Sequence, residues 1–61
     1  MADDPIAKLR HDLANPLSAI LAETQLLLLN EAQLDAELVE SLKHIEGLAR
    51  RMRDILQDRR G

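Results

Sequence analysis

The 61-residue chain is predicted to be all-α, an antiparallel helical hairpin that pairs with a second copy into a homodimeric four-helix bundle. Aromatic residues are absent, so the core must be aliphatic, which suits leucine-packed helices better than sheets. Two long apolar stripes repeat at steps of three and four residues, as helices require. A single turn-forming segment, residues 30–35, separates them. Residues 1–61 are therefore expected to form one small domain.

The first helix is expected to span about residues 4–29. Asp4 is a favourable N-cap, and Pro5 suits the first helical position, where its missing N–H costs nothing. The apolar stripe has one extra four-residue step beside Pro16, a phase change called a stutter. We interpret this stretch as one kinked helix; the alternative is a break, with Asn15 capping a new helix. The stripe consists of Ile6, Leu9, Leu13, Leu17, Ile20, Thr24 and Leu27, widened by Leu21 and Leu28.

Residues 30–35 are expected to form the turn, and residues 36–59 the second helix. Asn30 can end the first helix and Asp35 can cap the second, with Leu34 and Val39 placed as a hydrophobic staple. Because the connection is short, the two helices should run antiparallel. The second stripe consists of Leu38, Leu42, Ile45, Ala49, Met52 and Leu56, broadened by Leu48 and Ile55.

The small size of the chain predicts a partner. A unit of 61 residues buries too little surface to be robust alone, and without cysteine it has no disulfide or thiolate metal site. Two distant histidines are poor ligands, so no metal site is expected. Broad apolar faces on one hairpin cannot cover themselves, whereas two hairpins can, which predicts a homodimer. The alternative is a lone hairpin stabilised by a larger partner.

The net charge of −3 is unevenly distributed. Residues 50–61 hold five arginines and two acidic groups, a net charge of +3, against −6 for the rest. This basic end complements the dipole of a helix C-terminus, and without a binding motif we expect contact with neither nucleic acid nor membrane. No apolar run could cross a bilayer and no secretory signal is visible, so the sequence predicts a cytoplasmic location.

The chemically distinctive segment is residues 11–17, His-Asp-Leu-Ala-Asn-Pro-Leu. At about 100° per residue, His11 and Asn15 fall on one outward line, opposite the apolar stripe, with Asp12 on the flank. A neutral imidazole is a nucleophile near neutral pH, and Asp12 can partner its second nitrogen. Asn15 can hydrogen-bond a phosphoryl oxygen or a water. Pro16 loosens the turn that carries His11.

The pattern His11-Asp12-x-x-Asn15-Pro16-Leu17 resembles the H-box of two-component sensor histidine kinases, and the hairpin is similar in length to their dimerisation and histidine-phosphotransfer domain. The resemblance implies that His11 is the phosphoacceptor, which takes the γ-phosphoryl group of ATP and passes it to an aspartate of a response regulator receiver domain. It implies that Asp12 assists as acid or base, that Asn15 positions water for dephosphorylating the regulator, and that Pro16 bends the helix.

The resemblance also implies what this segment leaves to other domains. Two glycines and 61 residues supply no glycine-rich nucleotide lid, so ATP with magnesium is expected on a separate histidine-kinase ATP-binding domain, acting in cis or in trans. The chain itself is expected to bind no cofactor and not to autophosphorylate. We expect a domain excised from a longer kinase rather than a stand-alone phosphorelay protein.

Hairpin geometry should place His11 level with residues 53–55. The arginines near this end are then candidates for contact with phosphate or with the regulator; they are Arg50, Arg51 and Arg53. The alternative function is a catalytically inert helical dimerisation module.

Overall fold

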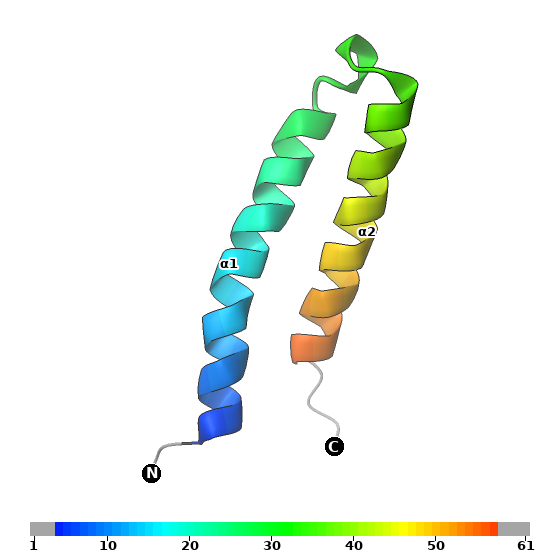
Figure 1. Ribbon diagram of the computed structural model, residues 1–61. Coiled ribbons are helices and arrows are strands. Elements are labelled where there is room, and N and C mark those ends of the chain that lie inside the picture. The colour runs from blue at the N-terminus through cyan, green and yellow to red at the C-terminus, as the bar shows by residue number, and fades with distance from the viewer. Residues whose placement is uncertain (1–3, 58–61) are drawn as a thin grey trace.

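The computed structural model describes residues 4–57, which form two long helices joined by a short turn (Figure 1). Helix α1 spans Pro5–Leu28, the 3₁₀ helix η1 spans Glu31–Gln33, and α2 spans Ala36–Gln57. The long helices lie side by side and antiparallel in a hairpin 50 Å long. The predicted all-α hairpin is confirmed, whereas the dimeric bundle stays a prediction. The expected end of the second helix, residue 59, lies outside the described residues.

The ends of α1 are fixed by local hydrogen bonds. The Asp4 carboxylate accepts from the backbone N–H of Ile6 at 3.0 Å, so it satisfies one of the N–H groups that a helix leaves unpaired at its start. At the other end, the N–H of Leu29 donates to the carbonyl of Gln25 at 3.1 Å. The N–H of Asn30 then donates to the carbonyl of Leu27 at 3.1 Å. This bond spans three residues instead of four, and α1 ends at Leu28.

The turn is ordered by bonds of its own. The N–H of Leu34 donates to the carbonyl of Glu31 at 3.1 Å within η1. Asp35 holds the N-cap position of α2, because its carbonyl accepts from the N–H of Val39 at 2.9 Å. Leu34 and Val39 are both half-buried, as a hydrophobic staple requires. Lys43 Nζ lies 3.6 Å from Glu31 Oε2 and ties the turn to α2.

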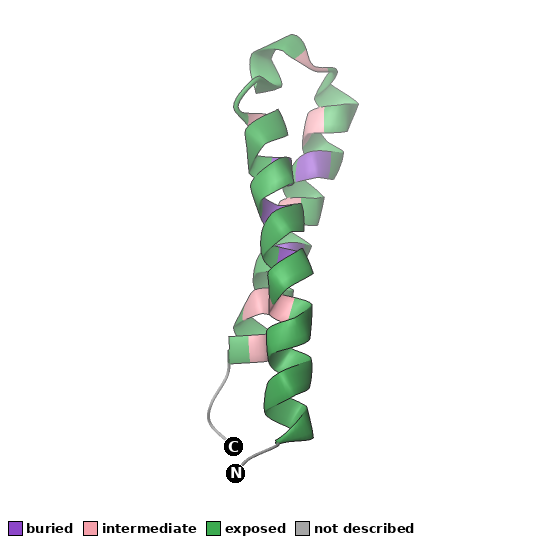
Figure 2. Ribbon diagram, turned by 90° about the vertical axis from the view of Figure 1, so that its left-hand side faces the viewer, coloured by how far each residue is buried: buried purple, intermediate pink, exposed green. Residues whose placement is uncertain are grey.

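The core between the two helices is narrow. Thr24 belongs to it, and its hydroxyl donates to the carbonyl of Ile20 at 2.7 Å, so its burial costs no unsatisfied polar atom. Figure 2 shows the buried positions in the middle and turn-side parts of the hairpin, with the first turns of α1 exposed throughout. Among the described residues, the buried ones are Leu17, Leu21, Thr24, Leu42 and Ala49.

Most of the two apolar stripes stays exposed. A helix that packs against one neighbour buries only the surface that faces that neighbour. An apolar stripe wide enough to pack against two helices is therefore only partly covered. The exposed fractions run from 43% at Leu13 and Ile45 to 63% at Ile55. The exposed stripe residues are Ile6, Leu9, Leu13, Ile20, Leu27, Leu38, Ile45, Leu48, Met52 and Ile55.

Leu21 tests how much the narrow core stabilises the hairpin. We expect Leu21→Ala to lower the free energy of unfolding by about 2–4 kcal/mol, because it removes a buried side chain and leaves a cavity. Leu26→Ala is the matched control, since Leu26 is 60% exposed and its truncation should cost less than about 1 kcal/mol. Urea denaturation followed by circular dichroism, at one fixed protein concentration, measures both. Equal losses in the two variants would contradict the assignment of the core.

Candidate functional site

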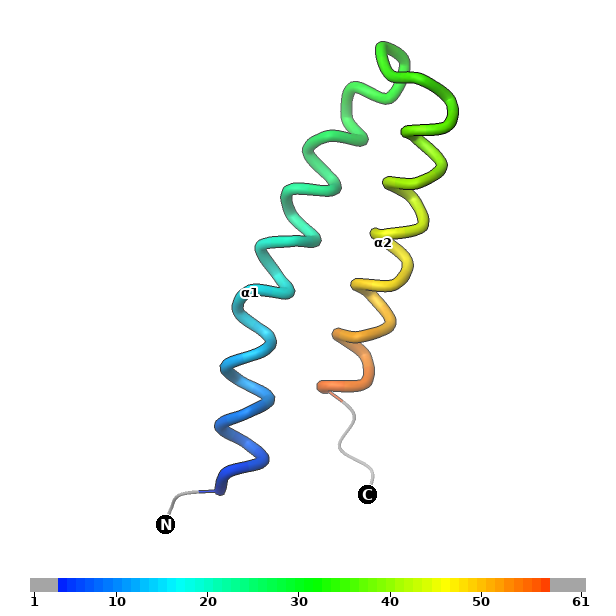
Figure 3. Tube along the Cα trace, in the orientation of Figure 1, coloured from blue at the N-terminus to red at the C-terminus, as the bar shows by residue number. Residues whose placement is uncertain are grey.

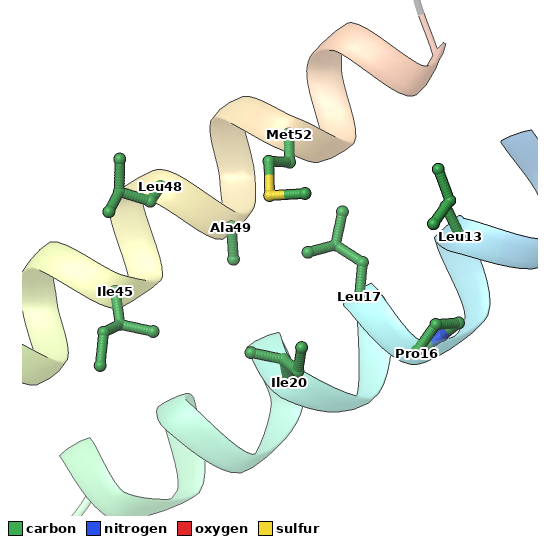
Figure 4. Close-up of a pocket in the computed structure, with 8 residues that line it drawn as sticks. All are labelled: Leu13, Pro16, Leu17, Ile20, Ile45, Leu48, Ala49 and Met52. Carbon is green, nitrogen blue, oxygen red and sulfur yellow. The ribbon is translucent and has the colours of Figure 1, made fainter.

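An apolar groove of about 270 Å³ lies between the helices near the middle of the hairpin. Figure 4 shows Leu17 and Ala49 pointing toward one another from facing helices, with the Pro16 ring at the α1 edge. The lining contains no charged side chain, so the groove suits another apolar surface rather than a phosphorylated ligand. Its lining residues are Leu13, Pro16, Leu17 and Ile20 of α1 and Ile45, Leu48, Ala49 and Met52 of α2.

Helix α1 continues through Pro16 without a break. Proline has no N–H to donate to the carbonyl of Asp12, four residues earlier, and its ring crowds that carbonyl. Figure 3 shows that the blue N-terminal part of α1 runs more steeply than the cyan and green part beyond it. The structure therefore matches one bent helix rather than a new helix capped by Asn15, and the bend separates the turns that carry residues 11 and 12 from the buried part.

His11 is presented to solvent from the exposed turns of α1. Its side chain keeps 76% of its full accessibility, and none of the residues from 4 to 13 is buried. Asn15, one turn later, is exposed as well. Neither residue lines the apolar groove. This agrees with the predicted outward line, and it means that a bulky phosphoryl donor can reach the imidazole without the hairpin opening.

The Asp12 carboxylate lies between the Lys8 ammonium group and the His11 imidazole. Its Oδ2 accepts from Lys8 Nζ at 2.9 Å, while its Oδ1 lies 3.9 Å from His11 Nδ1. The second distance is too long for a hydrogen bond, so Asp12 is beside the imidazole but bonded to the lysine. Lys8 is not among the residues predicted for the site, although opposite charges four residues apart in a helix are a recognised signal of pairing.

Arg50 is directed away from His11. Its Nη2 lies 3.2 Å from Glu46 Oε2, and the same carboxylate oxygen accepts from Gln25 Nε2 at 3.2 Å across the hairpin. Gln25 is fourteen residues after His11, which is about 20 Å along a helix. The structure therefore does not bring Arg50 together with the histidine.

Arg51 and Arg53 flank Met52, which lines the groove together with Leu13. Arg51 is exposed and Arg53 half-buried, and neither forms an ion pair within the described residues. The expectation that these two arginines contact phosphate or the regulator stays a prediction.

Residues 4–57 contain neither a metal-binding cluster nor a membrane-spanning helix. No cluster of three or more histidine, cysteine, aspartate or glutamate side chains there is arranged to hold a metal ion. No helix in that part of the chain has the length and apolar character needed to span a membrane.

The pattern around His11 has a counterpart in a known family. The model of the His Kinase A (phospho-acceptor) domain family matches residues 3–59, a stretch that contains His11 and both helices. Neither a curated protein nor a solved structure matches the chain.

Pro16 is expected to cost stability. Pro16→Ala restores the N–H that can donate to the carbonyl of Asp12 and removes the ring from the helix, so we expect the free energy of unfolding to rise by about 1–3 kcal/mol. Pro5→Ala is the control, because proline at the helix start lacks only an N–H that has no partner there. Urea titration compares the two. A loss of stability in Pro16→Ala would show that the groove contacts of the ring outweigh its backbone cost.

Proposed function

This chain belongs to the His Kinase A (phospho-acceptor) domain family, and we therefore propose that His11 accepts a phosphoryl group and passes it to an aspartate of a response regulator receiver domain. The observation that carries the proposal is the exposed imidazole of His11 with a carboxylate beside one ring nitrogen. An exposed histidine without such a neighbour would be an ordinary surface residue. The pairing, together with the family, favours phosphotransfer over an inert dimerisation module.

The arrangement assigns a role to each ring nitrogen. His11 Nδ1 faces Asp12 at 3.9 Å, which makes Nε2 the nitrogen directed away from the carboxylate. In the proposed step Nε2 attacks the γ-phosphorus of ATP, so an N–P bond forms and the bond to the ADP oxygen breaks. The proton on Nδ1 turns toward Asp12, which balances the positive charge that the ring acquires. In the second step a receiver carboxylate takes the phosphorus and the N–P bond breaks.

The donor and the acceptor are proposed to come from other domains. ATP with magnesium would be held by a histidine-kinase ATP-binding domain, in cis or in trans, and the receiver domain would approach the same exposed side of α1. Asn15 lies one turn from His11 and is exposed, which supports a role for its amide in orienting a water during dephosphorylation of the regulator. Arg51 and Arg53, on either side of the groove residue Met52, would supply positive charge for the phosphoryl group or the regulator.

We also propose that a second copy of the chain covers the apolar groove. Three observations favour dimerisation. The apolar stripes are only partly covered, the groove is lined by apolar side chains, and the chain of 61 residues has no cysteine. A two-fold arrangement would pack the same groove residues of both copies against each other. Because His11, Asp12 and Asn15 lie outside the groove lining, such a dimer would leave the phosphoacceptor accessible.

Labelling with radioactive ATP tests the proposed function. The chain is incubated with ATP and a purified histidine-kinase ATP-binding domain that phosphorylates it, and we expect acid-labile, alkali-stable label on the wild type, as phosphohistidine gives. His11→Gln should remove the label, because it removes Nε2, the proposed attachment point. Asn15→Ala is the neighbouring control and should keep accepting the label, while its phosphorylated regulator should persist longer. Label that remains on His11→Gln would overturn the assignment.

A further inference from the structure

Lys8 is connected to His11 through a single carboxylate. Lys8 Nζ donates to Asp12 Oδ2 at 2.9 Å, and the other oxygen of the same group, Oδ1, faces His11 Nδ1 at 3.9 Å. The lysine reaches Asp12 from one turn earlier on α1, whereas the histidine is the residue next to it. The three side chains therefore form a chain along the outer side of the exposed turns.

We propose that Lys8 is a positioning residue for phosphoryl transfer at His11. By holding one oxygen of Asp12, it keeps the other oxygen on the Nδ1 side of the imidazole. This inference rests on the proposed phosphoacceptor role of His11 and adds to it a residue outside the His11-Asp12-x-x-Asn15-Pro16 pattern.

The need for a positioning residue follows from the exposure of Asp12. Its side chain is 54% exposed, and within the described residues its polar neighbours are Lys8 and His11 alone. His11 Nδ1 lies 3.9 Å from Asp12 Oδ1. This distance is too long for a hydrogen bond, so His11 does not hold the carboxylate in place. Without the lysine, Asp12 would rotate among its rotamers and be hydrated by water. The bond to Lys8 selects the rotamer in which Oδ1 needs only a small movement to meet Nδ1.

The point at which Asp12 bonds to His11 also fits a positioning role for Lys8. The imidazole must be neutral to attack phosphorus, and in that form it attracts the carboxylate weakly. As Nε2 bonds to phosphorus the ring becomes cationic, and its Nδ1–H then draws Oδ1 into a hydrogen bond. Lys8 keeps its bond to Oδ2 throughout, since the two oxygens of a carboxylate accept independently. In this proposal Lys8 acts only through its bond to Asp12 and contacts neither the imidazole nor the phosphoryl group.

Phosphorylation of the 61-residue chain by phosphoramidate tests the proposal without an ATP-binding domain. In this reaction the Nε2–P bond forms, the P–N bond of the donor breaks, and ammonia leaves with the electron pair of that bond. Intact mass spectrometry follows the addition of one phosphoryl group. The chain has a second histidine, His44, so the rate at His11 is the difference between the wild type and His11→Gln.

We expect Lys8→Met to slow phosphorylation of His11 about two- to three-fold, the size that an exposed ion pair one turn apart supports. Lys8→Arg should keep most of the rate, because it can also donate to Oδ2. Lys43→Met is the matched control: it removes the same charge from an ion pair, with Glu31 at 3.6 Å, beside the turn. It should leave the rate unchanged. Methionine preserves helix propensity at both sites, and circular dichroism checks the helix content.

The decisive comparison is a double-mutant cycle with Asp12→Asn. If Lys8 acts through Asp12, Lys8→Met should have no further effect in the Asp12→Asn background. An equal slowing in both backgrounds would mean that Lys8 attracts the anionic donor directly, and a faster Lys8→Met would mean that the lysine holds Asp12 away from the imidazole; either overturns the proposal. A wild type that is phosphorylated no faster than His11→Gln would instead overturn the proposed function itself.

Discussion

Two helices packed side by side can cover only a narrow stripe of one another, and this constraint organises the whole hairpin. Here the covered stripe is short: Leu17 and Leu21 of α1 meet Ala49 of α2, with Leu56 packed against them. Leu17 and Ala49 also line the apolar groove beside Pro16, together with exposed apolar residues of both helices. A hairpin built in this way leaves an apolar groove open to solvent.

The division of α1 into separate sides lets one helix serve packing and chemistry together. One side enters the core, a second lines the groove, and a third carries His11 and the chain from Lys8 to Asp12. Pro16 lies where these regions meet, inside the helix and at the groove edge. The turns that carry His11 and Asp12 lie in the part of α1 that has no buried residue, so core packing does not constrain their sequence.

The elements could be predicted from the sequence because their signals are local. Asp4, Asn30 and Asp35 act within a few residues of their positions, and the outward placement of His11 follows from helical periodicity alone. Other features depend on how the two helices meet. Periodicity places Leu17 and Ile20 on one stripe, but only the interhelical contact buries the first and leaves the second 51% exposed.

The position of the Arg50 side chain could not be predicted for the same reason. Its link to Gln25 through Glu46 depends on the register of the two helices. Lys8 could have been found from its spacing to Asp12. A second copy of the chain is proposed to cover the groove while His11 stays outside. An isotope-filtered NOE spectrum of a mixture of labelled and unlabelled chains tests this directly. We expect intermolecular contacts from the methyl groups of Ile20, Ile45 and Met52, and none from the His11 ring. Intermolecular contacts at His11, or none at the groove methyl groups, would contradict this packing of two copies.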